Sequence, residues 1–368
     1  MKSKIIAIDL AKDVFEVAVA NDKGRILERQ RLSRKAFSAF LAVQPPALVL
    51  FEACGSAHFW GRSAQTAGHQ VRLLPAQYTA PYRRRGKTDR ADVEALLEAH
   101  RCNDIRPVPV HSVEQQTIQQ LHRIREQWKH TRTQRINGLR GFLRELGFAI
   151  PLGAKVAQKQ ARHIIDDPAI PSPLKVVFSR MLDELSALEA DMADVERQLK
   201  HLTKTNVDIQ RLQTITGVGL LTSTALVAAV GSPERFPDGK HLSSWLGLTS
   251  RDSSSGSRRH LGKITKQGDV YIRTLLVHGA RSVLTRIKTL QRAGKPLPRL
   301  YQWANALEQR VGHNKAACAL ANKMARICWA VWTKHTDFNP KPAEPEPNRV
   351  KVSRRHSQVR RRRWLRRY

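Results

Sequence analysis

The sequence predicts an α/β domain at the N-terminus, a helical middle region with a coiled coil, and a mainly α-helical domain towards the C-terminus. Short apolar runs alternate with amphipathic helical patterns over residues 1–105, which is typical of an α/β domain. Apolar residues recur at helical spacing over 106–204, and helical patterns return over 205–337. A Pro-rich linker and a basic, disordered tail are expected over 338–368.

The N-terminal domain is predicted to begin with three strands in succession and to continue with alternating strands and helices. The strands are expected at 5–9, 14–20, 25–32, 47–52 and 70–74, and the helices at 36–43, 56–67 and 88–100. Three meandering strands followed by strand–helix alternation, with an acid on the first strand, is the order expected of a ribonuclease-H-like domain.

Four carboxylates stand at the ends of elements in this domain. Asp9 follows the first apolar run, Glu52 ends a later one, and Asp89 and Asp92 share one face of the predicted 88–100 helix. If they converge, they repel each other unless divalent cations lie between them. Oxygen ligands suit Mg²⁺ or Mn²⁺, and two such ions about 3.5–4 Å apart clamp the attacking and leaving oxygens of a phosphodiester. A lone Asp after a strand is more often a cap or an ion-pair partner, so the prediction depends on the whole set.

The charge of the chain points to a polyanionic partner. It carries 64 Lys and Arg against 31 Asp and Glu, a formal net charge of +33. Nucleic acid is the first choice, because its phosphate backbone supplies most of the affinity for a basic protein. An anionic membrane surface is the alternative, and the lack of a bilayer-length apolar run weakens it.

The same composition indicates where the protein acts. No signal peptide is expected, because the first apolar run soon meets Asp9. The four cysteines form no C-x-x-C pair, so zinc is not expected, and they are interpreted as reduced cytosolic residues. We therefore expect a bacterial cytoplasmic, nucleoid-associated protein.

The middle region contains a basic helical stretch over 113–147. Its apolar residues recur at helical spacing, and the other faces carry basic residues, among them Arg123, Arg125, Lys129, Arg132 and Arg135. A solvated helix face is the simple interpretation, but the total charge favours a helix that contacts nucleic acid.

An acidic segment over 174–202 follows the basic stretch. Apolar residues spaced alternately by four and three predict a coiled-coil seam: Leu174, Phe178, Met181, Leu185, Leu188, Met192, Val195, Leu199 and Leu202. We expect this seam to pair protein with protein in a dimer or tetramer. An intramolecular hairpin with 113–147 is the alternative.

Two further features of the C-terminal half are candidates for nucleic-acid chemistry. The turn Gly217-Val218-Gly219 resembles a helix-hairpin-helix turn, whose N–H groups can bind a phosphate, although a simple turn between helices is equally expected. A Ser-rich loop contains Ser253, Ser254, Ser255 and Ser257 around Gly256.

Cations surround that loop. They are Arg251, Arg258, Arg259, Lys263 and Lys266, and they are candidates for binding nucleic acid. Lys87, two residues before Asp89, is a further candidate for binding nucleic acid. A Ser-rich loop is normally only flexible. With these cations, a serine oxygen that attacks a phosphodiester would have its transition-state charge stabilised. His260 is the nearest candidate base, and is as readily a phosphate contact.

Together these segments resemble the DEDD-type insertion-sequence transposases of the IS110 family, and most closely its IS1111 subgroup. The resemblance covers nearly the whole chain and rests on IAIDLAKDVFEVAV, FEACGSAHFWGR, KTDRADVEALLEA, LQTITGVG and SSSGSRRHLGKITKQGD. It implies a RuvC-like N-terminal domain whose acidic tetrad is Asp9, Glu52, Asp89 and Asp92. It also implies a C-terminal domain with a nucleophilic serine directly before a glycine, which matches Ser255.

The resemblance further implies an RNA-guided DNA recombinase. In such proteins an element-encoded non-coding (bridge) RNA pairs with donor and target DNA, and the serine forms a phosphoseryl link before strands are exchanged. The proteins act as oligomers, in which the serine of one protomer completes the acidic site of another. The loop reads SSSGS where relatives often have SSGG, so Ser254 stays open beside Ser255.

Two other functions compete with this interpretation. A hydrolytic RuvC-like nuclease or junction resolvase would need the four acids but not Ser255. A non-enzymatic nucleic-acid-binding protein would use only the basic surface and would survive loss of the acids.

Overall fold

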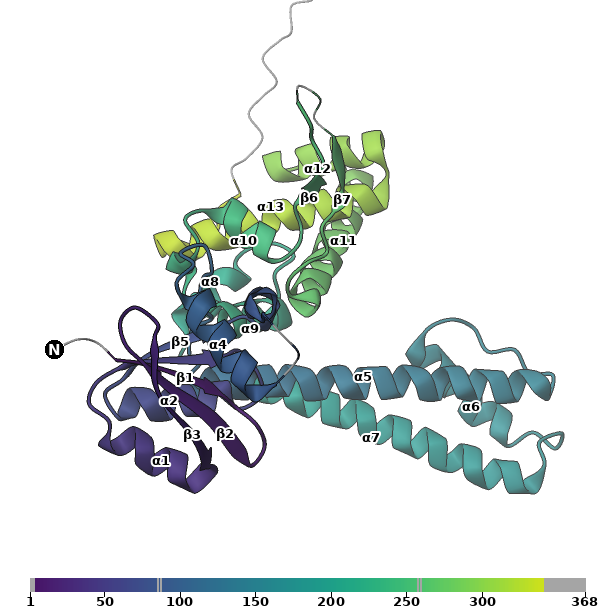
Figure 1. Cartoon of the computed structure of the whole chain (residues 1–368). Coiled ribbons are helices and arrows are strands. Elements are labelled where there is room, and N and C mark those ends of the chain that lie inside the picture. Colours follow the sequence, from purple (N-terminus) through teal and green to yellow (C-terminus); the bar gives the residue numbers. More distant parts are fainter. Residues whose placement is uncertain (1–3, 85, 87, 257, 259, 341–368) are drawn as a thin grey trace, which may run out of the picture. The chain divides into compact units, whose positions relative to one another are not determined.

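The computed structural model describes residues 4–84, 86, 88–256, 258 and 260–340 (Figure 1). The chain folds as two compact units. Of the residues described, unit 1 takes those within 4–213, 218–237 and 332–335, and unit 2 takes those within 214–217, 238–331 and 336–340. The domain boundaries predicted at 105, 204 and 337 stay predictions, and the expected linker and basic tail at 341–368 lie outside the described residues.

Unit 1 begins with a mixed five-stranded sheet in the order β3-β2-β1-β4-β5. The strands are β1 (Ile5–Asp9), β2 (Val14–Ala20), β3 (Ile26–Ser33), β4 (Leu48–Glu52) and β5 (Gln70–Leu74). The pairs β1–β2 and β2–β3 are antiparallel, whereas β1–β4 and β4–β5 are parallel. All five strands predicted from the sequence are confirmed, with end residues that differ by at most one position.

Helices cover both faces of this sheet. On one face, α1 (Arg34–Val43) and α2 (Ala57–Thr66) pack on the side chains of Ile6, Ile8 and their neighbours. On the other face, α4 (Asp89–His100) packs on the alternate residues Ile5 and Ala7. A short helix α3 (Ala76–Thr79) and a 3₁₀ turn (Ala80–Tyr82) connect β5 to α4. Because strand side chains alternate between faces, every second residue of β1 faces α4.

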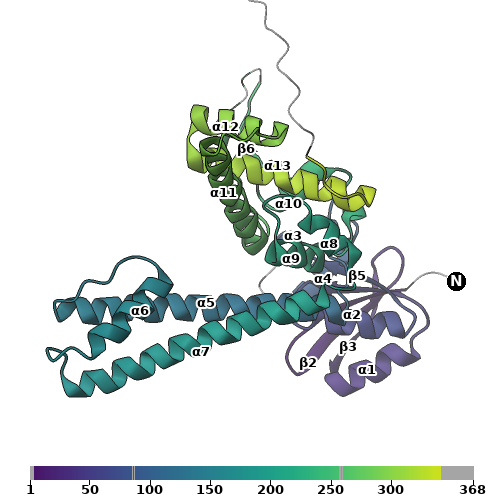
Figure 2. The ribbon, with the colours of Figure 1, turned by 180° about the vertical axis from the view of Figure 1, so that it is seen from behind.

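The middle of the chain forms a long helical hairpin within unit 1. Helices α5 (Val113–Glu145) and α7 (Ser172–Leu202) run side by side, and α6 (Ala154–Ile165) packs on them at the end far from the sheet (Figures 1 and 2). Ser112 and Gln115 form a capping box that fixes the start of α5.

The predicted 174–202 seam is buried inside this hairpin. Most of its apolar residues are buried, with Leu182 taking the inward position that the heptad pattern gave to the partly buried Met181. The intramolecular hairpin is therefore the arrangement found in the chain. Self-association stays a prediction.

Unit 1 also contains two shorter helices and a 3₁₀ turn that follow the hairpin. They are α8 (Val207–Gln213), α9 (Leu220–Val230) and the turn at Pro233–Arg235. Nearly all of α9 is buried, and its Ala228 packs against Ile118 of α5.

Unit 2 is mainly helical, as the sequence predicts, with one β-hairpin. It contains α10 (Gly239–Trp245), α11 (Val270–Arg292), α12 (Arg299–Val311) and most of α13 (His313–Lys334). The antiparallel strands β6 (Ser250–Asp252) and β7 (Leu261–Ile264) form a hairpin that projects from these helices (Figure 1). No helix in the described part of the chain is both long and apolar enough to cross a bilayer.

Candidate active site

The two predicted acids on strands lie on the face of the sheet that α4 covers. Asp9 is the last residue of β1 and continues the face of Ile5 and Ala7. Glu52 is the last residue of β4 and stands two positions after Leu50, which belongs to the same face. The parallel register pairs Ile8 with Phe51, so Asp9 and Glu52 end neighbouring strands at the same edge.

The other two acids come from the first turn of α4. The Thr88 side chain caps this helix, since its Oγ1 accepts a hydrogen bond from the Ala91 N–H at 3.2 Å. Asp89 and Asp92 follow at the N-terminal end, where the helix dipole favours negative charge. Because α4 packs on the same face as Asp9 and Glu52, the fold brings the four acids to one region.

The pKa of Asp9 is affected by the other three acids. Its pKa is raised to about 6, first by burial and then by the charges of Asp92, Asp89, Glu52 and Glu16. Among the described residues, however, no three Asp, Glu, His or Cys side chains form a group placed to hold a metal ion. The four carboxylates are therefore close enough to affect the pKa of Asp9, but in this conformation they do not form a complete set of metal ligands.

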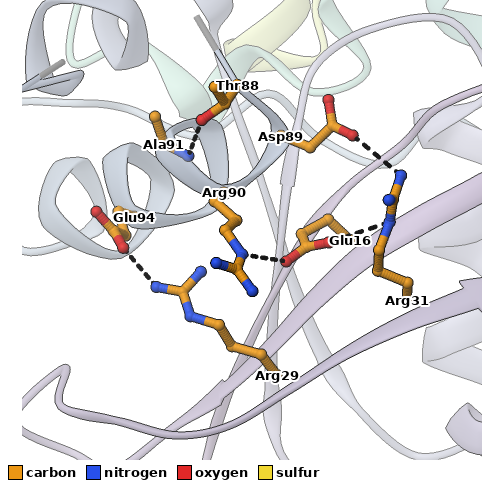
Figure 3. A network of polar contacts seen from close by, with 8 residues as sticks. All are labelled: Glu16, Arg29, Arg31, Thr88, Asp89, Arg90, Ala91 and Glu94. Carbon is orange, nitrogen blue, oxygen red and sulfur yellow. Dashed lines mark hydrogen bonds and ion pairs between the residues drawn. The ribbon is translucent and has the colours of Figure 1, made fainter. Parts of the chain in front are cut away.

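Arginines engage two of the four acids in this conformation. The Arg83 Nε lies 2.9 Å from Asp92, whose side chain is only 14% exposed. The Arg31 Nη2 lies 3.7 Å from Asp89 (Figure 3). A divalent cation bound here would therefore compete with these two guanidinium groups.

The sequence analysis missed a fifth acid, Glu16, in the same region. It is buried on β2 and stands directly opposite Asp9 in the antiparallel ladder. Its carboxylate pairs with Arg31 at 3.6 Å and Arg90 at 3.9 Å, as Figure 3 shows. The signal was a single carboxylate inside the apolar strand VFEVAVA, since a buried acid needs charged partners.

The predicted serine lies at the tip of the β6–β7 hairpin in unit 2. Ser255 and Arg258 exchange backbone N–H···O hydrogen bonds of 3.2 Å, and Gly256 at φ +55° occupies the turn between them. The sequence analysis predicted a loop here and no strands, because β6 and β7 are short and show no apolar alternation.

The structure distinguishes the two candidate serines. The Ser254 hydroxyl donates a hydrogen bond to the Asp252 carboxylate and accepts one from the His260 N–H at 3.1 Å. No described residue hydrogen-bonds the exposed Ser255 hydroxyl. The Ser255 hydroxyl is therefore exposed, whereas Ser254 and Asp252 hold the loop together, and which serine acts stays a prediction.

Two glycines pin the base of this hairpin to the body of unit 2. A Cβ on Gly247 would lie 1.9 Å from the Gln267 carbonyl oxygen, and one on Gly268 would lie 1.9 Å from that of Trp245. Both have positive φ, +68° and +87°. The buried Arg273 donates hydrogen bonds to the carbonyls of Leu246 and Gln267, so it supports this corner and does not face the serines.

The cations predicted around the serine divide into two groups. Arg251, Arg258, Lys263 and Lys266 are exposed on the hairpin and at its base. Arg259 and, near the acids, Lys87 lie outside the described residues. A role of these cations in binding nucleic acid stays a prediction.

Most of the cations predicted on α5 have acidic partners within the hairpin. Arg125 pairs with Glu196 at 2.6 Å, Arg132 with Glu189 at 3.7 Å and Arg135 with Glu184 at 2.9 Å, all three acids on α7. Lys129 pairs with Glu126 of its own helix at 2.6 Å. Arg123 is exposed. The acidic flanks of α7 thus serve the basic face of α5, and a role of these residues in binding nucleic acid stays a prediction.

The Gly217-Val218-Gly219 turn has a packing reason for its first glycine. Gly217 has φ +89°, and a Cβ there would lie 2.8 Å from the Met324 Cε and the Val283 Cγ2. Gly219 precedes α9, and a Cβ there would meet nothing within 4 Å. Phosphate binding at this turn stays a prediction.

Comparison with known proteins identifies the family. Residues 6–148 match the family of IS110 DEDD transposases, and residues 209–295 match the family described as "Transposase IS116/IS110/IS902 family". The chain is 38% identical to the "Probable family 20 transposase" of Pseudomonas aeruginosa, over 91% of this chain and 98% of that protein.

Two relatives are named for the elements that encode them. The chain is 36% identical to the "Transposase for insertion sequence element IS1111A" of Coxiella burnetii, over 91% of each chain. It is 33% identical to the "Transposase for insertion sequence element IS1328" of Yersinia enterocolitica, over 91% of this chain and 98% of that protein. The chain therefore belongs to the IS110 family of insertion-sequence transposases, and its substrate is DNA.

Proposed function

We propose that the protein cuts and rejoins DNA during transposition with two sets of groups, the four acids of unit 1 and Ser255 of unit 2. The observation that carries the proposal is the convergence of Asp9, Glu52, Asp89 and Asp92 from β1, β4 and α4 on one face of the sheet. After burial, the charges of the other three acids are the next causes of the raised pKa of Asp9. A DNA-binding surface gains nothing from a cluster of acids, since they repel phosphates, so this arrangement favours chemistry over binding alone.

The N-terminal domain is, in this proposal, ribonuclease-H-like and of the RuvC type. Three antiparallel strands followed by two parallel ones, in the order β3-β2-β1-β4-β5, support it. So does the position of Asp9 at the end of the central strand, with acids from β4 and α4 beside it.

The four acids would hold Mg²⁺ or Mn²⁺, as two ions. All four are carboxylates, the donors that these cations prefer, and the mutual repulsion at Asp9 is what bound cations relieve. Bound divalent ions would stabilise the charge that develops on the phosphodiester. For them to bind, Asp92 and Asp89 would have to release Arg83 and Arg31.

Ser255 would act as the nucleophile. Its hydroxyl loses a proton to a base, its oxygen bonds to a DNA phosphorus, and the bond from phosphorus to the leaving sugar oxygen breaks. That sugar oxygen takes up a proton, and a phosphoserine link remains. The reverse step, with a sugar hydroxyl of another strand as attacking group, rejoins the DNA and frees Ser255. Arg251 and Arg258 stand on the same hairpin to stabilise the charge.

The proposal includes an element-encoded guide RNA and self-association. The net charge of +33 suits two polyanions. Oligomers would have to use the outer faces of the α5–α7 hairpin or other surfaces, because the 174–202 seam is buried within the chain.

A denaturing gel tests the proposal. Labelled DNA with the element's junction and a target site is incubated with protein, Mg²⁺ and the element's non-coding RNA. Wild type is compared with Asp9→Asn, Ser254→Ala, Ser255→Ala and the neighbouring control Ser253→Ala. A protein–DNA adduct is expected in wild type, Ser253→Ala and Ser254→Ala, and no adduct is expected in Asp9→Asn or Ser255→Ala. Cleavage without adduct that persists in Ser255→Ala would mean a hydrolytic nuclease, and an adduct that disappears in Ser254→Ala instead would move the nucleophile one residue.

A further inference from the structure

A large cavity lies within unit 2 between the serine hairpin and α13. Its volume is about 1180 Å³, more than a single small ligand needs. The hairpin contributes Ser250 and the Leu261–Ile264 strand, α12 contributes Trp303, and α13 forms the longest wall. The chemistry proposed for Ser255 makes no use of this cavity.

Helix α13 has two different faces. One face, with Leu320, Met324 and Cys328, is fully buried in the core of unit 2. The opposite face lines the cavity, and small residues such as Ala319 and Ala330 leave room above the helix. Asn322 fixes that wall, because its side-chain N–H group donates to the Ser243 Oγ at 2.7 Å and the Leu248 carbonyl at 3.0 Å.

The cavity carries a strong excess of positive charge. Five cations are among its described lining residues, and no Asp or Glu is: Lys263, Lys266, Lys315, Lys323 and Arg326. The Lys323 Nζ lies 4.1 Å from the centre of the Trp303 ring. Burial and then the charges of Arg326 and Arg299 lower the pKa of Lys323, which shows that cations repel one another here.

The walls between these cations are apolar and aromatic. Leu248, Leu261, Ile264 and Ile327 line the cavity together with Trp303, whose side chain is 37% exposed. A bare phosphate would not need this apolar surface, and an apolar peptide would not need five cations. A nucleotide has both a flat apolar base and an anionic phosphate.

We propose that this cavity holds an unstacked nucleotide of the DNA strand that Ser255 attacks, with its base against Trp303 and its flanking phosphates on Lys263, Lys323 and Arg326. The identity of the strand rests on the proposed function. Ser250 and Ser255 belong to one arm of the hairpin and are at most about 17 Å apart at ~3.3 Å per residue. Successive nucleotides rise ~3.4 Å when stacked and reach further when unstacked, so the cavity lies within a few nucleotides of the attacked phosphate.

Binding measurements on the full chain test the proposal. The Ser255→Ala protein, without divalent metal, is titrated with a short labelled single-stranded DNA. Trp303→Ala in that background is expected to weaken binding about 5- to 100-fold, since stacking on an aromatic ring contributes about 1–3 kcal/mol per base. Trp303→Phe is expected to keep most of the affinity.

Matched controls isolate the cavity. Lys323→Gln is compared with Lys295→Gln, a charge removal outside the cavity on the same unit, and only the first is expected to weaken binding strongly. A DNA with 5-iodouracil in place of thymine is expected to cross-link to Trp303 on irradiation. Equal affinity of wild type and Trp303→Ala, or equal weakening in Lys323→Gln and Lys295→Gln, would overturn the proposal.

Two further experiments distinguish DNA from other ligands, and distinguish this inference from the proposed serine chemistry. The same sequence as RNA, or an acidic peptide, that binds through Trp303 while DNA does not would overturn the assignment to DNA. An adduct that forms normally in Trp303→Ala with unchanged affinity would overturn this inference and leave the proposed function intact. Loss of binding in Trp303→Ala with no adduct in wild type would support the cavity and count against the serine chemistry.

Discussion

Asp9 and Glu16 face each other directly across the antiparallel pair of β1 and β2. Two carboxylates in this position repel each other, and Glu16 is buried while Arg31 and Arg90 supply its countercharge. The candidate site therefore consists of five acids and a set of arginines that balance them.

The pKa of Asp9 is expected to fall when a neighbouring carboxylate is neutralised. Asp92→Asn should lower it more than Glu16→Gln, because Asp92 exerts the larger charge effect of the two. Carboxyl ¹³C NMR titration of Asp9 without metal measures both shifts. A pKa of Asp9 that moves in neither variant would show that burial alone raises it. Glu114→Gln, at the start of α5, is the control and should leave the pKa of Asp9 unchanged.

The contribution of His122 to the stability of unit 1 is expected to be lost as the pH falls from about 6.5 towards 4. Burial, and then the charge of Arg125, lower the pKa of His122 to about 4. Since the unfolded chain takes up this proton first, stability is fully present above the unfolded value and is lost as the pH falls through the window to the folded value. The loss is at most about 3 kcal/mol.

Urea midpoints at pH 7 and pH 4.5 measure this loss. Relative to wild type, His122→Gln should shift the pH 4.5 midpoint upward compared with the pH 7 midpoint, and the exposed His130→Gln should leave both as in wild type. The raised pKa of Asp9 acts in the opposite direction and is common to all three proteins. The burial of His111, whose pKa is also lowered to about 4, contributes to any remaining difference.

Arg123→Ala is expected to weaken nucleic-acid binding more than Arg135→Ala. Arg123 is exposed with no acidic partner among the described residues, whereas Arg135 is held by Glu184. If Arg123 binds a phosphate, its removal should also reduce the slope of log affinity against log salt by about one. Equal weakening in the two variants would mean that the ion pair with Glu184 does not prevent Arg135 from binding DNA or RNA.

Gly217→Ala is expected to destabilise the protein by about 1–3 kcal/mol. The new Cβ would collide with Met324 and Val283, and φ is +89°. Gly219→Ala, two residues on, has open space and φ −94° and should cost less than about 1 kcal/mol. Thermal unfolding compares the two, and similar midpoints would show that the turn relaxes without cost.

The sequence was most informative where a local pattern of apolar residues defines a strand or helix and the acid stands at the end of that element. The apolar run over 5–8 and the helical pattern over 88–100 placed Asp9 and Asp89 without any long-range contact. The pairing of Asp9 with Glu16 could not be predicted in the same way, because it depends on the register of two strands and on arginines from β3 and α4.

Long-range competition explains the remaining differences. The 174–202 heptads are satisfied equally by a second chain or by α5, and only the chain's own fold decides between them. The serine hairpin was predicted as a loop because its short strands β6 and β7 are exposed and show no apolar alternation. The cavity beside it needs α12 and α13, which lie far away in the sequence.

Because two glycines fix the base of the serine hairpin, the length of its two arms sets the distance of Ser255 from the protein body. Gly247 and Gly268 fix where the hairpin leaves the protein body, whereas a Cβ on Gly256 at its tip would meet no described atom within 4 Å. Two residues added to each arm, which keep every side chain on its face, would carry Ser255 outward by ~6.6 Å and leave the core untouched. Arm length therefore sets how far from the protein a DNA backbone must run to be cut, and it can change without any change in the chemistry.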